Sequence, residues 1–187
     1  MKRLAPALLL ATALALPAHA VIILDSTYEA EGYAASEALA AEPQFAASFA
    51  LCDAVDEGCG NASGTWIGND ESHGYILTAA HAFDGEDYAA RWVYRSRAGK
   101  YYTASDVAVH PAYVRVEATK QETAYSLGFD VAIVTLSEPV DDAGEPPLLY
   151  TGTDEEGMTL TFMGYGTRGR ASKGEDEGER GQRMDTH

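Results

Sequence analysis

Short apolar segments separated by clusters of glycine, asparagine, aspartate and serine recur along the chain, and this pattern most constrains its fold. Their β-branched and aromatic residues favour strands, and the clusters between them favour tight turns. The segments expected to form strands are residues 21–24, 45–51, 65–67, 75–80, 91–95, 100–104, 107–111 and 129–136. Residues 34–42, rich in Ala, Leu and Glu and followed by Pro43, are the one segment that predicts a helix. The pattern therefore predicts an all-β protein built on a closed or nearly closed antiparallel barrel.

The first twenty residues have the composition of a targeting segment. Lys2 and Arg3 precede an apolar stretch over residues 4–16, and Pro17 and an Ala-His-Ala sequence follow it. This order is typical of a secretory signal peptide, and we expect cleavage after Ala20. No later stretch reaches the roughly 18 apolar residues of a membrane span. We therefore expect a secreted or periplasmic protein that has no membrane anchor once the signal peptide is removed.

The charge balance is strongly acidic. The chain carries a formal net charge of −16, and cleavage would remove Lys2 and Arg3 but no acid, leaving 11 basic against 29 acidic residues, a net charge of −18. Such a surface repels phosphate backbones, so nucleic acid is not an expected partner. Solubility, or adaptation to a salty exterior, accounts for the excess of acids.

The chain contains two cysteines, Cys52 and Cys59, which lie close together. An even number of cysteines in an exported chain favours a disulfide. A metal site would need more ligands nearby. We therefore expect a small local disulfide.

Two residues are candidates for chemistry. His81 ends an apolar segment, and Ala79 and Ala80 leave room for its ring to face a cleft, although a lone histidine in this position is commonly structural. Asp130 lies at the start of an apolar strand, where burying a carboxylate is unfavourable unless the carboxylate is paired. Considered alone, Asp130 is interpreted as a turn residue at the end of a strand. Together they have a chemical purpose, because a carboxylate that accepts from one imidazole nitrogen leaves the other free to take a proton from a nucleophile.

Five stretches resemble the trypsin-like (chymotrypsin-fold) serine proteases of the secreted bacterial type. Residues 77–81, LTAAH, are similar to the family's histidine motif, and residues 129–136, FDVAIVTL, to its aspartate motif. The other matches are HPAY at 110–113, GTWI at 64–67 and FMGYGT at 162–167. They occur in the family's order and cover roughly residues 60 to 168.

The resemblance implies a double antiparallel β-barrel and an endopeptidase. It places the first barrel, with His81 and Asp130, in residues 21–145, and the beginning of a second barrel in residues 146–187. His81 would be the general base and later the general acid, and Asp130 its orienting partner. The substrate would be a polypeptide, and no cofactor is implied.

The sequence departs from the family pattern where the nucleophile is concerned. No Gly-Asp-Ser-Gly-Gly motif occurs, and the two serines after Asp130, Ser137 and Ser172, do not lie in glycine turns, so neither is assigned as the nucleophile. Ala82 stands where many relatives have a disulfide cysteine. The start of the expected mature chain, VIIL at 21–24, only loosely resembles the family's Ile-Val-Gly-Gly, which leaves activation by a new N-terminus unsupported.

The polar, charge-rich tail from Gly169 by itself predicts a disordered end. With the resemblance, it is similar to a surface loop of the second barrel. We therefore expect a truncated chain that lacks the nucleophile and is inactive by itself.

Two other classes of function remain as alternatives. One is a non-catalytic exported binding module on the protease scaffold, whose acidic surface would favour basic partners. The other is a metal protein that uses the tail acids or Asp84, Glu86 and Asp87, although this loop lacks the alternating ligands of a calcium-binding EF-hand. His73 and His81 do not have a zinc spacing, and His73 is expected to be a free surface histidine.

Overall fold

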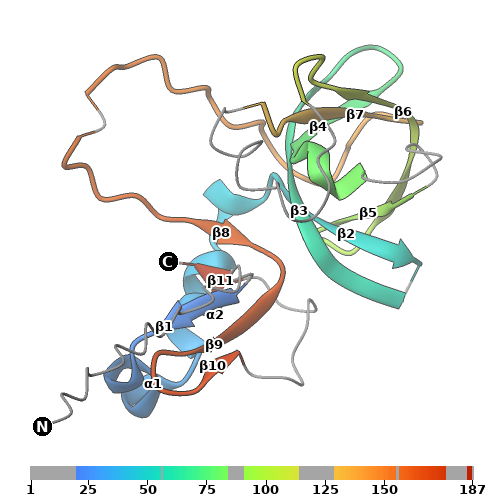
Figure 1. Ribbon diagram of the computed structural model, residues 1–187. Helices are drawn as coiled ribbons and strands as arrows, with labels where there is room; N and C mark the ends of the chain where they lie inside the picture. The colour runs from blue at the N-terminus through green and yellow to red at the C-terminus, as the bar shows by residue number, and fades with distance from the viewer. Residues whose placement is uncertain are drawn as a thin grey trace, which may run out of the picture.

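A closed antiparallel barrel dominates the computed structural model, which describes residues 20–55, 57–83, 91–113, 129–154, 156–175 and 185–186. The barrel occupies the upper right of Figure 1. Its strands are β2 (Ser48–Ala54), β3 (Glu57–Asn69), β4 (Gly74–Thr78), β5 (Val93–Ser96), β6 (Tyr101–Val109) and β7 (Ala132–Leu136). They pair in the order β2-β3-β4-β7-β6-β5, and β5 closes the barrel on β2. The predicted all-β fold is confirmed.

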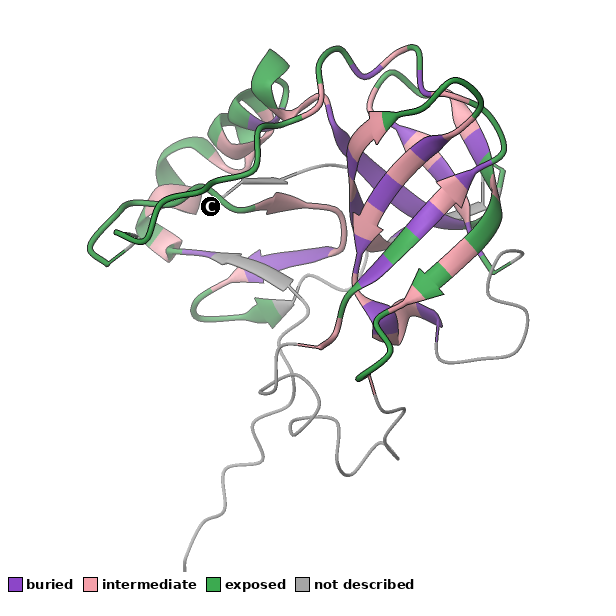
Figure 2. Ribbon diagram, turned by 90° about the horizontal axis from the view of Figure 1, so that it is seen from above, coloured by how far each residue is buried: buried purple, intermediate pink, exposed green. Residues whose placement is uncertain are grey.

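Alternation along the strands explains why this sequence forms a barrel. Inward positions of β4 and β7, such as Ile76 and Val134, are fully buried, whereas the neighbouring Ile133 is 39% exposed. Figure 2 shows the same alternation of buried and more exposed residues around the barrel. The largest buried side chains come from β2, β5 and β6 as well, namely Phe49, Leu51, Tyr94 and Tyr102. Because successive side chains point to opposite faces of a strand, this period of two fills the interior of the barrel.

The long strand β3 pairs with both β2 and β4 and depends on a glycine. A Cβ on Gly64 would lie 2.4 Å from Cγ2 of Ile76 on β4. No side chain fits at that separation, so glycine is what allows β3 to pass this close to its neighbour.

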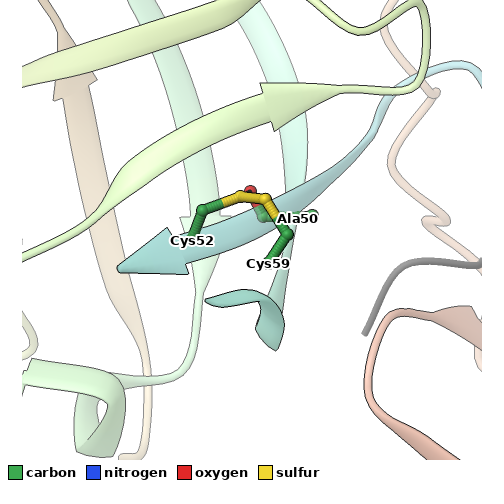
Figure 3. Close-up of a disulfide and its surroundings, with 3 residues drawn as sticks. All are labelled: Ala50, Cys52 and Cys59. Carbon is green, nitrogen blue, oxygen red and sulfur yellow. Dashed lines mark hydrogen bonds between the residues drawn. A yellow bond between two sulfur atoms is a disulfide. The ribbon is translucent and has the colours of Figure 1, made fainter. Parts of the chain in front are cut away.

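The expected disulfide between Cys52 and Cys59 is present and links β2 to β3 (Figure 3). The two cysteines are directly opposite in the β2–β3 register, with their Cα atoms 3.9 Å apart.

A second, smaller part of the molecule combines the two ends of the described chain (Figure 1). Its elements are β1 (Ala20–Ile23), α1 (Asp25–Glu31), α2 (Ala34–Ala40), η1 (Pro43–Phe45), β8 (Met163–Gly164), β9 (Thr167–Arg170), β10 (Gly174–Glu175) and β11 (Asp185–Thr186). β1 pairs with β9 in parallel, β10 pairs with β9 antiparallel, and β11 pairs with β8.

The connection between the barrel and this second part is extended. Residues 141–154 and 156–162 contain no helix or strand, and large apolar side chains along them face solvent, whereas Ala143 is buried in the barrel core. Leu148 is 97% exposed and Phe162 68%. Figure 1 shows this connection looping away from the barrel.

Several local predictions differ from the structure. The helix expected over 34–42 ends at Ala40, and α1 was not expected. The strands expected at 100–104 and 107–111 are one continuous strand, β6. The tail was expected to be disordered by its composition, but residues 169–170 and 174–175 pair as strands because β1 and β9 supply partners. In the part of the chain that the structure describes, no helix is long and apolar enough to cross a membrane.

Candidate active site

Pairing between β4 and β7 brings His81 and Asp130 to the same end of the barrel. Thr78, the last residue of β4, lies opposite Ala132, the first residue of β7. His81 follows in the 3₁₀ helix η2 (Ala80–Phe83), and Asp130 comes just before β7. An antiparallel register puts the end of one strand beside the start of the other, so residues far apart in the sequence meet here.

His81 and Asp130 make two contacts with each other. Nδ1 of His81 lies 2.7 Å from Oδ2 of Asp130, and the backbone N–H of His81 donates to Oδ1 at 2.9 Å. The side chain of His81 is 39% exposed and that of Asp130 16%. Both carboxylate oxygens therefore fix the histidine, one through its ring and one through its main chain.

This geometry determines what the imidazole can do. A carboxylate beside Nδ1 favours the tautomer that carries its proton on Nδ1, so Nε2 is the basic nitrogen. The same carboxylate stabilises the imidazolium that forms when Nε2 takes a proton. The pair therefore has the chemistry of a general base with an orienting acid.

The main chain after His81 is held by a residue that the sequence did not single out. Nε1 of Trp92 donates to the carbonyl oxygen of Ala82 at 2.8 Å, and Trp92 is only 7% exposed. Phe83 is buried in the barrel core. A tryptophan at the start of an otherwise regular strand was the available signal, because a buried indole N–H needs an acceptor.

The main chain around Asp130 is held by the HPAY stretch at 110–113. The ring of His110 stacks on Phe129, with centroids 5.1 Å apart, and the backbone N–H of His110 donates to the carbonyl oxygen of Val131 at 2.9 Å. The Nδ1 atom of His110 accepts from the backbone N–H of Ala112 at 3.1 Å. This histidine therefore supports the carboxylate's position.

Comparison with known families agrees with this geometry. The family model of the trypsin-like peptidase domain matches residues 62–184. This range is more than half of the chain and includes both His81 and Asp130. The chain belongs to the trypsin-like peptidase family. No curated protein matches the chain significantly. The family makes this a protease-type domain, for which polypeptides are the substrates.

Neither late serine of this trypsin-like domain is placed to be a nucleophile for His81. Ser137 follows the far end of β7 from Asp130, roughly 20 Å away along extended chain, and its hydroxyl accepts from Thr103 at 3.2 Å. Ser172 lies between β9 and β10, where its hydroxyl donates to Asp25 at 2.7 Å.

Among the described residues of the trypsin-like domain, no group of three His, Cys, Asp or Glu could hold a metal ion. Asp84, Glu86 and Asp87, the alternative calcium ligands, lie outside the described residues, as do the tail acids of 176–184.

His73, expected to be a free surface histidine, lies at the surface but beside an acid. Its Nδ1 lies 3.5 Å from Oδ1 of Asp70, and its side chain is 40% exposed. Asp70 also accepts from the hydroxyl of Tyr75 and from the backbone N–H groups of Ser72 and His73. These hydrogen bonds, that of Tyr75 foremost, lower the pKa of Asp70 to about 2.

Proposed function

We propose that this domain is part of a serine endopeptidase that cleaves peptide bonds with a Ser-His-Asp triad. The observation that carries the proposal is the double contact between His81 and Asp130, at 2.7 and 2.9 Å. In the proposed mechanism, Nε2 of His81 takes the proton of a serine hydroxyl as its oxygen attacks the scissile carbonyl. The protonated ring then gives that proton to the leaving amine, which leaves an acyl-enzyme for water to hydrolyse. Asp130 stays ionised throughout and stabilises the imidazolium.

The proposal assigns the nucleophile to residues that follow His187 in a longer chain. None of the serines within the 187 residues lies in a Gly-Asp-Ser-Gly-Gly context, the setting that exposes a hydroxyl beside backbone N–H donors. We expect the 187 residues by themselves to lack peptidase activity.

We also propose that the protein is exported. The basic and apolar pattern of residues 1–20 supports this, and so does the Cys52–Cys59 disulfide, because disulfides persist mainly in oxidising compartments. Expression with the complete leader, followed by intact-mass measurement of the exported protein, tests it. The measured mass is expected to match a chain that begins at Val21, and a mass that includes residues 1–20 would contradict the proposed export.

The catalytic proposal is tested on the chain extended by the codons that follow His187 in the gene. The wild-type extended protein is expected to hydrolyse labelled casein and to react with a fluorophosphonate, which modifies activated serines. His81→Ala is expected to abolish both, because no group would remove the proton of the serine. His73→Ala is the matched control, since His73 lies in the turn between β3 and β4 and pairs with Asp70 instead.

Two outcomes would overturn the catalytic proposal. One is casein hydrolysis by His81→Ala at the wild-type rate. The other is a stop codon directly after His187 together with an exported protein of matching mass, and this result would favour the non-catalytic binding module.

A further inference from the structure

We infer that α2 is a brace that fixes β9 relative to the barrel, and that Arg97 and Glu37 are positioning residues of the protease. The catalytic part of this inference rests on the proposed function. The structural part does not, because every contact involved lies among the described residues. The inference starts from the position of α2, which contacts the barrel at its C-terminal end and β9 along its middle.

Arg97 makes the contact with the barrel. It lies in the turn between β5 and β6, and its Nη1 donates to the carbonyl oxygens of Ala40 at 3.1 Å and Glu42 at 2.6 Å. Ala40 is the last residue of α2, and the last carbonyls of a helix have no partner within the helix, so the guanidinium satisfies an acceptor there. Glu42 lies between α2 and η1, and its carbonyl oxygen also accepts from the backbone N–H of Phe45 at 3.1 Å. A cation on a barrel turn thus holds the C-terminal end of α2.

Glu37 makes the contact with β9. Its Oε1 accepts from Nη1 of Arg168 at 2.7 Å, and Arg168 is only 4% exposed. The guanidinium of Arg168 also lies 3.9 Å from the ring centroid of Tyr33, the residue that precedes α2. Burying the charge of Arg168 is energetically unfavourable unless partners contact it. The contacts with Glu37 and Tyr33 therefore stabilise β9 in this position.

Further contacts extend this docking along β9 and the turn after it. β1 pairs with β9 in parallel, and the backbone N–H of Ala171 donates to the carbonyl oxygen of Ile23 at 3.0 Å. The guanidinium of Arg170 lies 4.2 Å from the ring centroid of Tyr28 on α1. The segment from β1 to α2 therefore docks on β9 as a unit.

A second contact joins the C-terminal strands directly to the barrel, close to Arg97, whose charge acts on Tyr165. The hydroxyl of Ser63 on β3 accepts from the backbone N–H of Tyr165 at 2.6 Å and donates to its carbonyl oxygen at 3.0 Å. The neighbouring strand β8 also contacts β2 and β3. The brace adds an attachment through Arg97, and each further attachment restricts how far β9 can move relative to the barrel.

This restriction matters for a triad whose members come from two parts of a molecule. His81 and Asp130 lie on the barrel, and the proposed nucleophile would follow the C-terminal strands. A misplacement of about 1 Å can reduce a rate roughly a hundredfold. The family match begins at residue 62, so α2 lies outside the region that identifies the family.

Hydrogen exchange of residues 21–187, the chain without its leader, tests the structural part of the inference. Arg97 makes its contacts with α2, yet Arg97→Gln is expected to speed amide exchange in β9 roughly tenfold, because the released brace lets β9 open locally. The amides of β7 are the internal reference and should not change. Arg91→Gln is the matched control: Arg91 belongs to the same barrel, with its guanidinium 4.5 Å from the ring centroid of Trp92.

Two more variants test whether the contacts of Arg97 and Glu37 act together as a brace or independently of each other. Glu37→Gln should release β9 to a similar extent, and adding Arg97→Gln to it should give little further increase, because one broken link already frees the strand. Arg97→Lys keeps a cation that can donate to the same carbonyls and should retain most of the protection. Unchanged exchange in β9 of Arg97→Gln, or fully additive effects in the double variant, would overturn the inference.

The catalytic part is tested on the extended, active protein. Arg97→Gln is expected to lower kcat by roughly ten- to a hundredfold with a smaller change in KM, and to leave the pH profile set by His81 in place. A wild-type kcat in Arg97→Gln would overturn the positioning role. An inactive wild-type extended protein would instead contradict the proposed function, and the exchange result would stand or fall independently of it.

Discussion

The barrel and the C-terminal region, residues 141–175, differ in how completely they bury their large apolar side chains. In the barrel each strand pairs on both sides, and Leu51, Ile76 and Val134 are fully buried. In the C-terminal region, Leu148 and Leu149 are 97% and 77% exposed, and β8 is two residues long. Closure gives the barrel an interior and removes its edges, whereas β9 pairs with β1 and the two-residue β10, and β8 pairs with the two-residue β11.

The contrast explains why the positions of His81 and Asp130 depend on the barrel. His81 and Asp130 both follow from the pairing of β4 with β7, so the pair needs nothing from the C-terminal region. Any contribution from that region depends instead on the few contacts that attach it, such as Ser63 with Tyr165. The barrel therefore holds His81 and Asp130 together by itself.

The largest expected effect tests whether this pair works as a unit within the barrel. In the extended, active protein, Asp130→Asn should lower kcat by about 10⁴, because the amide favours the wrong histidine tautomer and does not stabilise the imidazolium. Casein hydrolysis gives the rate, and thermal unfolding followed by the fluorescence of Trp66 and Trp92 checks the barrel. An unchanged rate would show that Asp130 is only a structural partner of His81.

The barrel's contribution to the site could be predicted from the sequence because its signals are local. The apolar residues of 75–80 and 129–136 indicated two strands, and His81 and Asp130 lie just outside the ends of β4 and β7 that meet. The cysteines were close enough in the sequence for a local disulfide to be the simplest expectation. These patterns depend on neighbours a few residues apart, which a sequence displays directly.

The second part could not be predicted because its stability comes from distant partners. The charge-rich composition around Arg170 predicts disorder, but it does not reveal that β1 pairs with β9. Nothing near Arg97 indicates that it binds the end of α2. Such contacts exist only once the barrel and the termini have come together.

A pair of identical substitutions tests the difference in burial between the two regions. Leu51→Ala in the barrel should lower the free energy of unfolding by about 2 to 5 kcal/mol, because it removes a fully buried side chain and leaves a cavity. Leu149→Ala should change it by no more than about 0.5 kcal/mol. Urea unfolding of the 187-residue chain measures both. Equal losses would mean that the C-terminal region covers Leu149 in solution, and the comparison would fail.

The smallest expected effect concerns pH and lies in the turn between β3 and β4. The pKa of Asp70 is lowered from 3.8 to about 2, chiefly by the hydroxyl of Tyr75 and the amides of Ser72 and His73. Because the folded pKa lies below the unfolded one, the ionised carboxylate stabilises the folded barrel above about pH 4, and this contribution is lost as the pH falls toward 2. Asp70→Asn should therefore lower the Tm at pH 6 by a small amount.

The difference in Tm between wild type and Asp70→Asn should shrink as the pH is lowered from 5 toward 2, because Asp70 becomes increasingly protonated and loses the charge that Asn lacks. Glu71→Gln, which alters an exposed acid in the same turn, is the matched control and should not produce this convergence. Trp66 and Trp92 are the chain's two tryptophans and both belong to the barrel core, so their fluorescence reports the unfolding of the barrel. A difference in Tm that is independent of pH would mean that the turn is held by hydrogen-bond geometry alone, without a contribution from the charge of Asp70.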